Sequence, residues 1–138
     1  MLKLLIGVVP VCILGSGLAN AGQNINVAGV MACVVDKWNE TEPKKGHKLV
    51  DYVGRCVIVP DDAGVQKAVE DCSGTYEYMP DGSWKGSGGC TAAVKSGDTI
   101  SLTWEEGSQL KESLYTYTGG TGKYKGAKGG GTYKVDEL

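Results

Sequence analysis

The sequence contains no phenylalanine and a single histidine, His47, which stands next to a loop rich in lysine and glycine. A catalytic histidine needs a nucleophile and an orienting acid, and no such arrangement accompanies His47. We therefore interpret His47 as a surface residue, and no nucleophilic hydrolase is indicated.

The sequence also has no Cys-x-x-Cys pair. Four cysteines follow the N-terminal segment, and their separations of 23, 16 and 18 residues do not fit a zinc site. They are Cys33, Cys56, Cys72 and Cys90. We expect neither a metal nor another cofactor.

Positive charge is not in excess either. Without Lys3 the chain carries 13 basic and 16 acidic residues, a net charge of −3. A general nucleic-acid partner is therefore not expected. Lys123, Lys125 and Lys128 form a small basic group, which we interpret as a solvated edge.

The first 21 residues have the pattern of a secretory signal peptide. Met1-Leu-Lys3 is positive, Leu4 to Leu18 is apolar, and Ala19-Asn-Ala21 fits a cleavage site. About 15 apolar residues are too few for a membrane span of about 20. We predict a signal peptide over 1–21, a single domain over 22–138, no stable membrane anchor after cleavage, and a secreted or periplasmic location. Cys12 would be removed with the signal.

The even number of remaining cysteines predicts two disulfides in an exported chain. Pro80-Asp-Gly82 predicts a hairpin turn between Thr75–Met79 and Ser83–Lys85. If Met79 faces Ser83, Cys72 faces Cys90, which favours the pairs Cys72–Cys90 and Cys33–Cys56. Cys56–Cys72 is the main alternative, because glycines after the hairpin would allow a bulge.

Short strands with turns at near-regular spacing dominate the rest of the chain. Ile100, Leu102 and Trp104 alternate with polar residues, as expected for a strand with one buried face. Further strands are expected at Ile25–Val35, His47–Val59, Thr91–Lys95, Lys111–Thr118 and Gly131–Val135. We expect a loop at 36–46 and one short helix or structured loop at 63–72. The sequence thus predicts an all-β antiparallel barrel of six to eight strands.

A glycine-rich segment, Gly119–Gly131, follows the strand ending at Thr118. Because it keeps Tyr124 and is flanked by strand residues, we interpret it as a sharp corner of the sheet rather than a linker. Few residues follow it, so the barrel is expected to be incomplete at its C-terminus or to end in a short closing strand. An exposed sheet edge would permit a homo-oligomer.

The corner sequence Gly119-Gly-Thr-Gly-Lys-Tyr-Lys-Gly-Ala-Lys-Gly129 resembles the glycine motif of dirigent proteins and allene oxide cyclases. The segment Thr75–Gly88 also resembles small exported bacterial proteins of unassigned role. The first resemblance implies an eight-stranded antiparallel barrel of calycin type. The acidic and active-site residues of those families have no counterpart by motif here, so no catalytic residue is transferred.

Tyrosine and tryptophan supply all the aromatic side chains, and these have an apolar body and a polar tip. Such residues suit either a ligand-lined barrel or a small filled one, and filling is favoured by the narrow interior of an eight-stranded barrel. The candidate ligand-binding residues on strands are Tyr76, Tyr78, Trp84, Trp104, Tyr115 and Tyr117.

Glu77 is the one candidate for a buried acid, on the condition that its face of the strand points inward. Glu105 and Glu106 are adjacent on a strand and so point to opposite faces. Three functions follow: binding of a small apolar or aromatic ligand, recognition of a partner or inhibition through loops such as 37–48 and the lysine corner, and a cyclase or isomerase activity. An open interior cavity would favour the first, and an inward polar residue the third.

Overall fold

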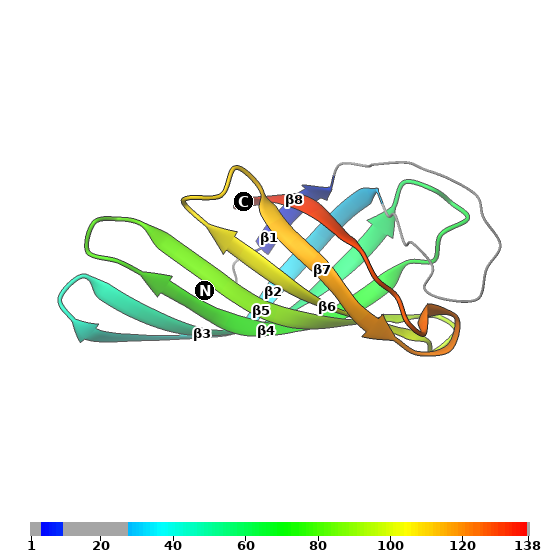
Figure 1. The fold of residues 1–138 in the computed structure, drawn as a ribbon, viewed down its shortest axis with the longest axis horizontal. Coiled ribbons are helices and arrows are strands. Elements are labelled where there is room, and N and C mark those ends of the chain that lie inside the picture. Colours follow the sequence, from blue (N-terminus) through cyan, green and yellow to red (C-terminus); the bar gives the residue numbers. More distant parts are fainter. Residues whose placement is uncertain (1–3, 10–27, 138) are drawn as a thin grey trace.

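The computed structural model describes the backbone of residues 4–9 and 28–137 and the side chains of residues 28–135. Eight strands and one short 3₁₀ helix make up the fold (Figure 1). In chain order they are β1 (Leu4–Val9), β2 (Gly29–Lys44), β3 (His47–Pro60), β4 (Ala68–Tyr78), β5 (Trp84–Val94), β6 (Thr99–Gly107), β7 (Ser113–Gly120), η1 (Gly122–Tyr124) and β8 (Gly130–Glu137).

The strands pair antiparallel in sequence order around one closed barrel. Strands β2 to β8 form a curled half-barrel, and β1 joins its two edges by pairing with β2 and with β8. The all-β antiparallel barrel predicted from the sequence is confirmed. The short C-terminal strand expected after the glycine corner is β8, which pairs with both β7 and β1.

The closing strand β1 comes from the segment predicted to be a signal peptide. The cleavage site at Ala19–Ala21 and the residue Cys12 lie outside the described residues. Cleavage stays a prediction, and it would remove the strand that joins the edges of β2 and β8.

The β4–β5 hairpin has the predicted register. Tyr78 pairs with Trp84, and Cys72 pairs with Cys90, with no bulge between them. Both predicted disulfides are present: Cys72–Cys90, with a Cα–Cα distance of 4.1 Å, and Cys33–Cys56, with 4.0 Å. Each bond therefore joins directly opposite residues of neighbouring strands, where the side chains approach most closely.

The prediction of a loop over 36–46 is wrong, because β2 continues to Lys44 and the turn is confined to Lys45 and Gly46. The residues from Asp36 onward are exposed on both faces, so they lack the apolar alternation that marks a strand. The β2–β3 and β4–β5 hairpins extend to the end of the molecule opposite the glycine corner (Figure 1). The proposed interaction loop 37–48 is thus a hairpin.

The helical interpretation of residues 63–72 is also wrong. Residues 61–67 contain a turn and bends and no helix, and β4 starts at Ala68 with alternating burial up to Tyr76. The pattern was misleading because the polarity is inverted at two positions. Val69 points outward and is 49% exposed, while Glu70 points inward and is 5% exposed.

The glycine corner is an ordered cap. Between β7 and β8, positive φ angles at Gly122, Gly126 and Gly129 allow the chain to fold back into the barrel end. Tyr124 and Ala127 are buried there, 9% and 1% exposed, against Ala92, Val94 and Ile100. The predicted corner is confirmed, and it closes one end of the core.

Candidate ligand cavity

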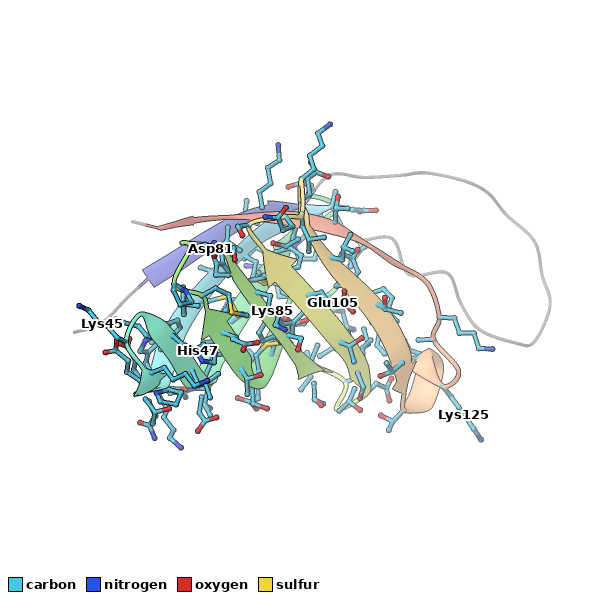
Figure 2. The ribbon with its side chains drawn as sticks, turned by 60° about the vertical axis from the view of Figure 1, so that its left-hand side comes forward. Lys45, His47, Asp81, Lys85, Glu105 and Lys125 are labelled. Atoms are coloured by element: carbon cyan, nitrogen blue, oxygen red, sulfur yellow. A yellow bond between two sulfur atoms is a disulfide. The ribbon has the colours of Figure 1, made fainter. Side chains whose placement is uncertain are left out.

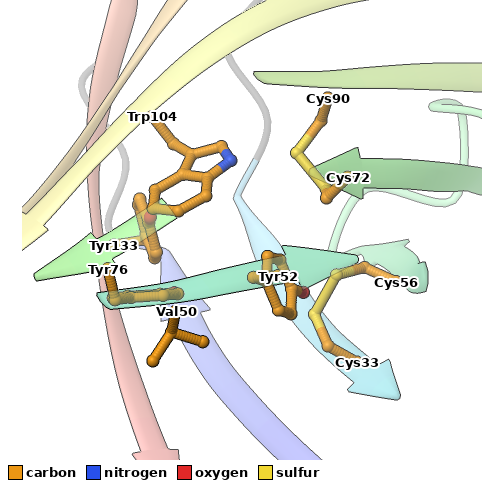
Figure 3. Packing of buried hydrophobic residues seen from close by; sticks show 9 residues of the cluster. All are labelled: Cys33, Val50, Tyr52, Cys56, Cys72, Tyr76, Cys90, Trp104 and Tyr133. Carbon is orange, nitrogen blue, oxygen red and sulfur yellow. A yellow bond between two sulfur atoms is a disulfide. The ribbon is translucent and has the colours of Figure 1, made fainter. Parts of the chain in front are cut away.

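Aromatic rings fill the middle of the barrel. Trp104, Tyr52, Tyr76 and Tyr133 are buried together, and Figure 3 shows their rings grouped with both disulfides to one side. The rings of Trp104 and Tyr76 are 5.5 Å apart, and those of Trp104 and Tyr52 are 6.1 Å apart. This half of the interior is a packed core, as the size of an eight-stranded barrel predicts.

Inward-facing glycines make that packing geometrically feasible. A Cβ atom at Gly74 or Gly88 would collide with the indole of Trp104, and one at Gly86 would collide with the ring of Tyr76. The strands β4 and β5 therefore provide bare backbone where the rings need space.

A cavity of about 150 Å³ remains inside the barrel. Toward the glycine corner the inward side chains are smaller, and the lining there includes Ala68, Ala92, Val94, Ile100 and Tyr124. Gln66, in the β3–β4 connection, also lines it. Small residues on neighbouring strands thus leave a space that the aromatic group does not fill.

Glu70 is the buried acid of this cavity. Its side chain lies inside the barrel on β4, between the small residues and the Cys72–Cys90 disulfide. Burial raises the pKa of Glu70 from its ordinary value of 4.5 to about 7, because the charged form loses its hydration. Among the described residues, the polar neighbour of its carboxyl group is Sγ of Cys72, 4.0 Å away. That sulfur is oxidised and carries no hydrogen to donate.

A second carboxyl group, that of Glu106, faces the interior from the other half of the barrel. It accepts hydrogen bonds from the hydroxyl groups of Tyr133, at 2.7 Å, and Tyr76, at 2.9 Å. Burial, followed by the nearby charge of Glu106, raises the pKa of both tyrosines. Glu106 is thus a satisfied acceptor whose hydrogen bonds link β4, β6 and β8.

Ligand atoms of Cys56, Glu70 and Cys72 lie within 4.8 Å of one another, which is close enough to suggest a metal site. Both sulfur atoms are bound in disulfides, however, and a metal ligand must be a free thiolate. The cluster does not supply the donor set of a metal centre.

The six predicted ligand-binding aromatics divide into three pairs. Tyr76 and Trp104 belong to the packed core and form part of the cavity wall. Tyr115 and Tyr117 also line the cavity, with their rings 5.3 Å apart. Tyr78 and Trp84 stack on each other at 6.2 Å, at the hairpin end of the barrel, and are not part of the cavity lining.

Glu77, the acid singled out from the sequence, faces outward, so the condition for a buried acid is not met. Its carboxylate pairs with Nε2 of His47 at 2.8 Å and Nζ of Lys85 at 2.9 Å. Lys85 and His47 lower the pKa of Glu77 by hydrogen bonding. His47 is partly exposed in this surface pair, consistent with its interpretation as a surface residue (Figure 2).

Sequence reasoning missed Glu70, Glu106, Tyr52 and Tyr133. A usable signal existed for Glu70, because residues i and i−2 of a strand share a face and Cys72 was placed inward by its disulfide. The same rule extends the Ile100, Leu102, Trp104 face to Glu106. The sequence around Tyr133 gives no such signal, because the glycines that precede it show no alternation of apolar and polar side chains.

Comparisons with protein-family models, with curated proteins and with solved structures found no match. In the part of the chain that the structure describes, no helix has the length and apolar character of a membrane span. The two disulfides are typical of exported proteins.

Proposed function

We propose that this protein is an exported binding protein that holds a small apolar or aromatic ligand inside its barrel. The observation that carries the proposal is the cavity of about 150 Å³ that the barrel's own aromatic residues leave open. An apolar cavity of about this size accommodates a benzene-sized molecule. A mostly apolar wall with one or two polar groups is typical of small-molecule sites.

Export is part of the proposal. The N-terminal sequence pattern and the two disulfides support it. The barrel resemblance of the glycine corner agrees with a ligand-binding role, since eight-stranded barrels of this size can hold one small ligand.

The test uses toluene as a single-ring neutral ligand and a matched pair of variants. Ala92 is 3% exposed and lines the cavity, whereas its neighbour Ala93 is exposed on the outside. We expect toluene to bind the wild type and Ala93→Leu, as measured by calorimetric titration and by an increase in Tm. In Ala92→Leu the longer side chain should occupy the cavity and abolish binding. Equal binding to both variants, or none to the wild type, would contradict the proposal.

A second candidate is an isomerase-type enzyme, which is favoured by the buried carboxyl group of Glu70 in the cavity. A general acid–base works best when its pKa lies near the operating pH, and the pKa of Glu70 is about 7. Such an enzyme would move a proton on a substrate enclosed beside Glu70. Solvent deuterium exchange into a bound single-ring ketone, followed by NMR, distinguishes it from a binding protein, which would show no catalysed exchange.

A further inference from the structure

Among the described residues, the wall of the cavity has acidic side chains and no basic one. Besides Glu70, the titratable side chains that line it are Glu106 and six tyrosines, namely Tyr52, Tyr76, Tyr115, Tyr117, Tyr124 and Tyr133. Among the described residues, no Lys, Arg or His lines the cavity. Its polar character is therefore complementary to a cation.

The carboxyl groups of Glu106 and Glu70 differ in their hydrogen-bond partners. Glu106 already accepts two tyrosine hydroxyl groups. Glu70 is 5% exposed, and among the described residues its carboxyl group has one polar contact, with the disulfide sulfur of Cys72 at 4.0 Å. A buried carboxylate without a donor is strongly disfavoured, so Glu70 is the open acceptor of the cavity.

The tyrosine rings of the cavity add a second feature of cation sites. Tyr52, Tyr115 and Tyr117 line the same cavity as Glu70. Burial is the largest cause of the raised pKa of each of these tyrosines, and the charge of Glu70 is a smaller one. The negative faces of tyrosine rings attract organic cations. The cavity that holds the Glu70 carboxyl group thus also has tyrosine π faces and hydroxyl groups, supplied by β3 and β7.

We infer that the preferred ligand of the cavity is a small aromatic amine cation, whose ammonium group pairs with the Glu70 carboxylate while its ring occupies the space lined by Ala92 and Ile100. This inference rests on the proposed function, because it names the ligand class of the same cavity. A charge-assisted hydrogen bond formed away from water is stronger than a neutral one. The ligand would supply a hydrogen-bond donor to Glu70, whose contact among the described residues is the disulfide sulfur of Cys72.

The pairing has a defined pH dependence. Below pH 7 the Glu70 carboxyl group is protonated, so an ammonium ligand must displace that proton before it can pair. Above pH 7 the carboxylate is already present and binding gains nothing further. Binding of an amine should therefore be about tenfold weaker at pH 6 than at pH 8. Burial raises the pKa of five lining tyrosines, which therefore stay protonated over this range: Tyr52, Tyr76, Tyr115, Tyr117 and Tyr133.

The experiment titrates the full-length oxidised protein with benzylamine and with toluene, which have similar size and differ in charge. Calorimetric titrations at pH 6, 7 and 8 are made on the wild type, on Glu70→Gln and on Glu77→Gln. Glu77 is the control, because it is a carboxylate of the same chain on the outer surface. Near-ultraviolet circular dichroism of the buried Trp104 reports whether each variant is folded.

We expect benzylamine to bind the wild type at pH 8 at least about tenfold more tightly than toluene, because its ammonium group forms an ion pair with Glu70 away from water. Glu70→Gln should lose that advantage, and Glu77→Gln should keep it. If toluene binds and benzylamine is no tighter, or if Glu70→Gln keeps the preference, the inference fails while the proposed function stands. If neither compound binds the folded wild type, the proposed function itself fails.

Discussion

The indole of Trp104 occupies the space that a side chain at Gly88 would need. A Cβ atom built on Gly88 would lie 2.5 Å from Cζ2 of Trp104 and 2.7 Å from the Cα of Gly74. The glycine content of β4 and β5 is therefore part of the core packing. It leaves room inside the barrel for the ring of Trp104, and the cavity lies beside the aromatic group.

The first prediction concerns this contact. Gly88→Ala should lower the free energy of unfolding by about 2 kcal/mol, because the backbone of Ser73 and Gly74 and the indole of Trp104 leave the new methyl group no room. The adjacent Gly89→Ala is the control, since its nearest neighbour is the carbonyl oxygen of Leu102 at 3.3 Å. Urea denaturation of both variants measures the difference. Equal stability of the Gly88→Ala and Gly89→Ala variants would show that the packing of Trp104 does not require a glycine at position 88.

The second prediction concerns the pH dependence of stability. Because the folded pKa of Glu70, about 7, lies above its ordinary value of 4.5, the folded state holds a proton that the unfolded state has released. Stability should therefore fall as pH rises from 4.5 to 7 and stay level above that. At about 1.4 kcal/mol per pH unit the total is about 3 kcal/mol for this residue.

Glu70→Gln removes that charge and should be about 3 kcal/mol more stable than the wild type at pH 8, with little difference at pH 4.5. Urea denaturation at pH 4.5, 6, 7 and 8 measures this, with Glu77→Gln as the surface control. A wild type whose stability rises between pH 5 and 7, relative to Glu70→Gln, would mean that Glu70 is charged and paired in the folded protein.

The third prediction concerns the disulfides. Replacing both Cys72 and Cys90 by alanine should cost about 3 kcal/mol, since the bond closes a loop of 18 residues. The Cys33–Cys56 pair closes a longer loop and should cost slightly more. Denaturation of the two double variants provides the values. A loss below about 1 kcal/mol for either would show that strand pairing alone holds those residues together.

The fourth prediction concerns the barrel edges. A chain that starts at Gly22 lacks β1, so Gly29–Val34 of β2 and Lys134–Glu137 of β8 lose the strand between them. Unpaired edges with free backbone groups recruit strands, and we expect this chain to form a dimer or larger oligomer. Size-exclusion chromatography with light scattering, compared with the chain that keeps residues 1–21, measures the mass. A stable monomer without β1 would contradict the expectation.

Much of the fold could be predicted from the sequence, because strand alternation and turn residues are local signals. Pro80 and Gly82 fixed the hairpin register, and that register correctly paired Cys72 with Cys90. The alternation of Ile100, Leu102 and Trp104 likewise gave the inward face of β6.

The candidate site was harder to predict, because it depends on exceptions to that alternation. In β4 the apolar Val69 is outside and the acidic Glu70 is inside, which imitates a helical pattern. The inward direction of Glu70 follows from the inward position of Cys72 two residues later on the same strand, and the polarity of Glu70 itself indicates the opposite. The sequence alone also left the direction of Glu77 open, and Glu77 was therefore the predicted buried acid. The structure places it on the outer surface with His47 and Lys85.

The central claim is that a small ring binds inside the barrel beside Glu70, and not on its outer surface. The most direct measurement is an isotope-filtered NMR experiment that records nuclear Overhauser contacts between toluene and the labelled protein. We predict contacts to the methyl groups of buried Ile100 and to the ring of Tyr117, both of which line the cavity. Contacts confined to outward valines such as Val57 and Val69, which are 45% and 49% exposed, would contradict it.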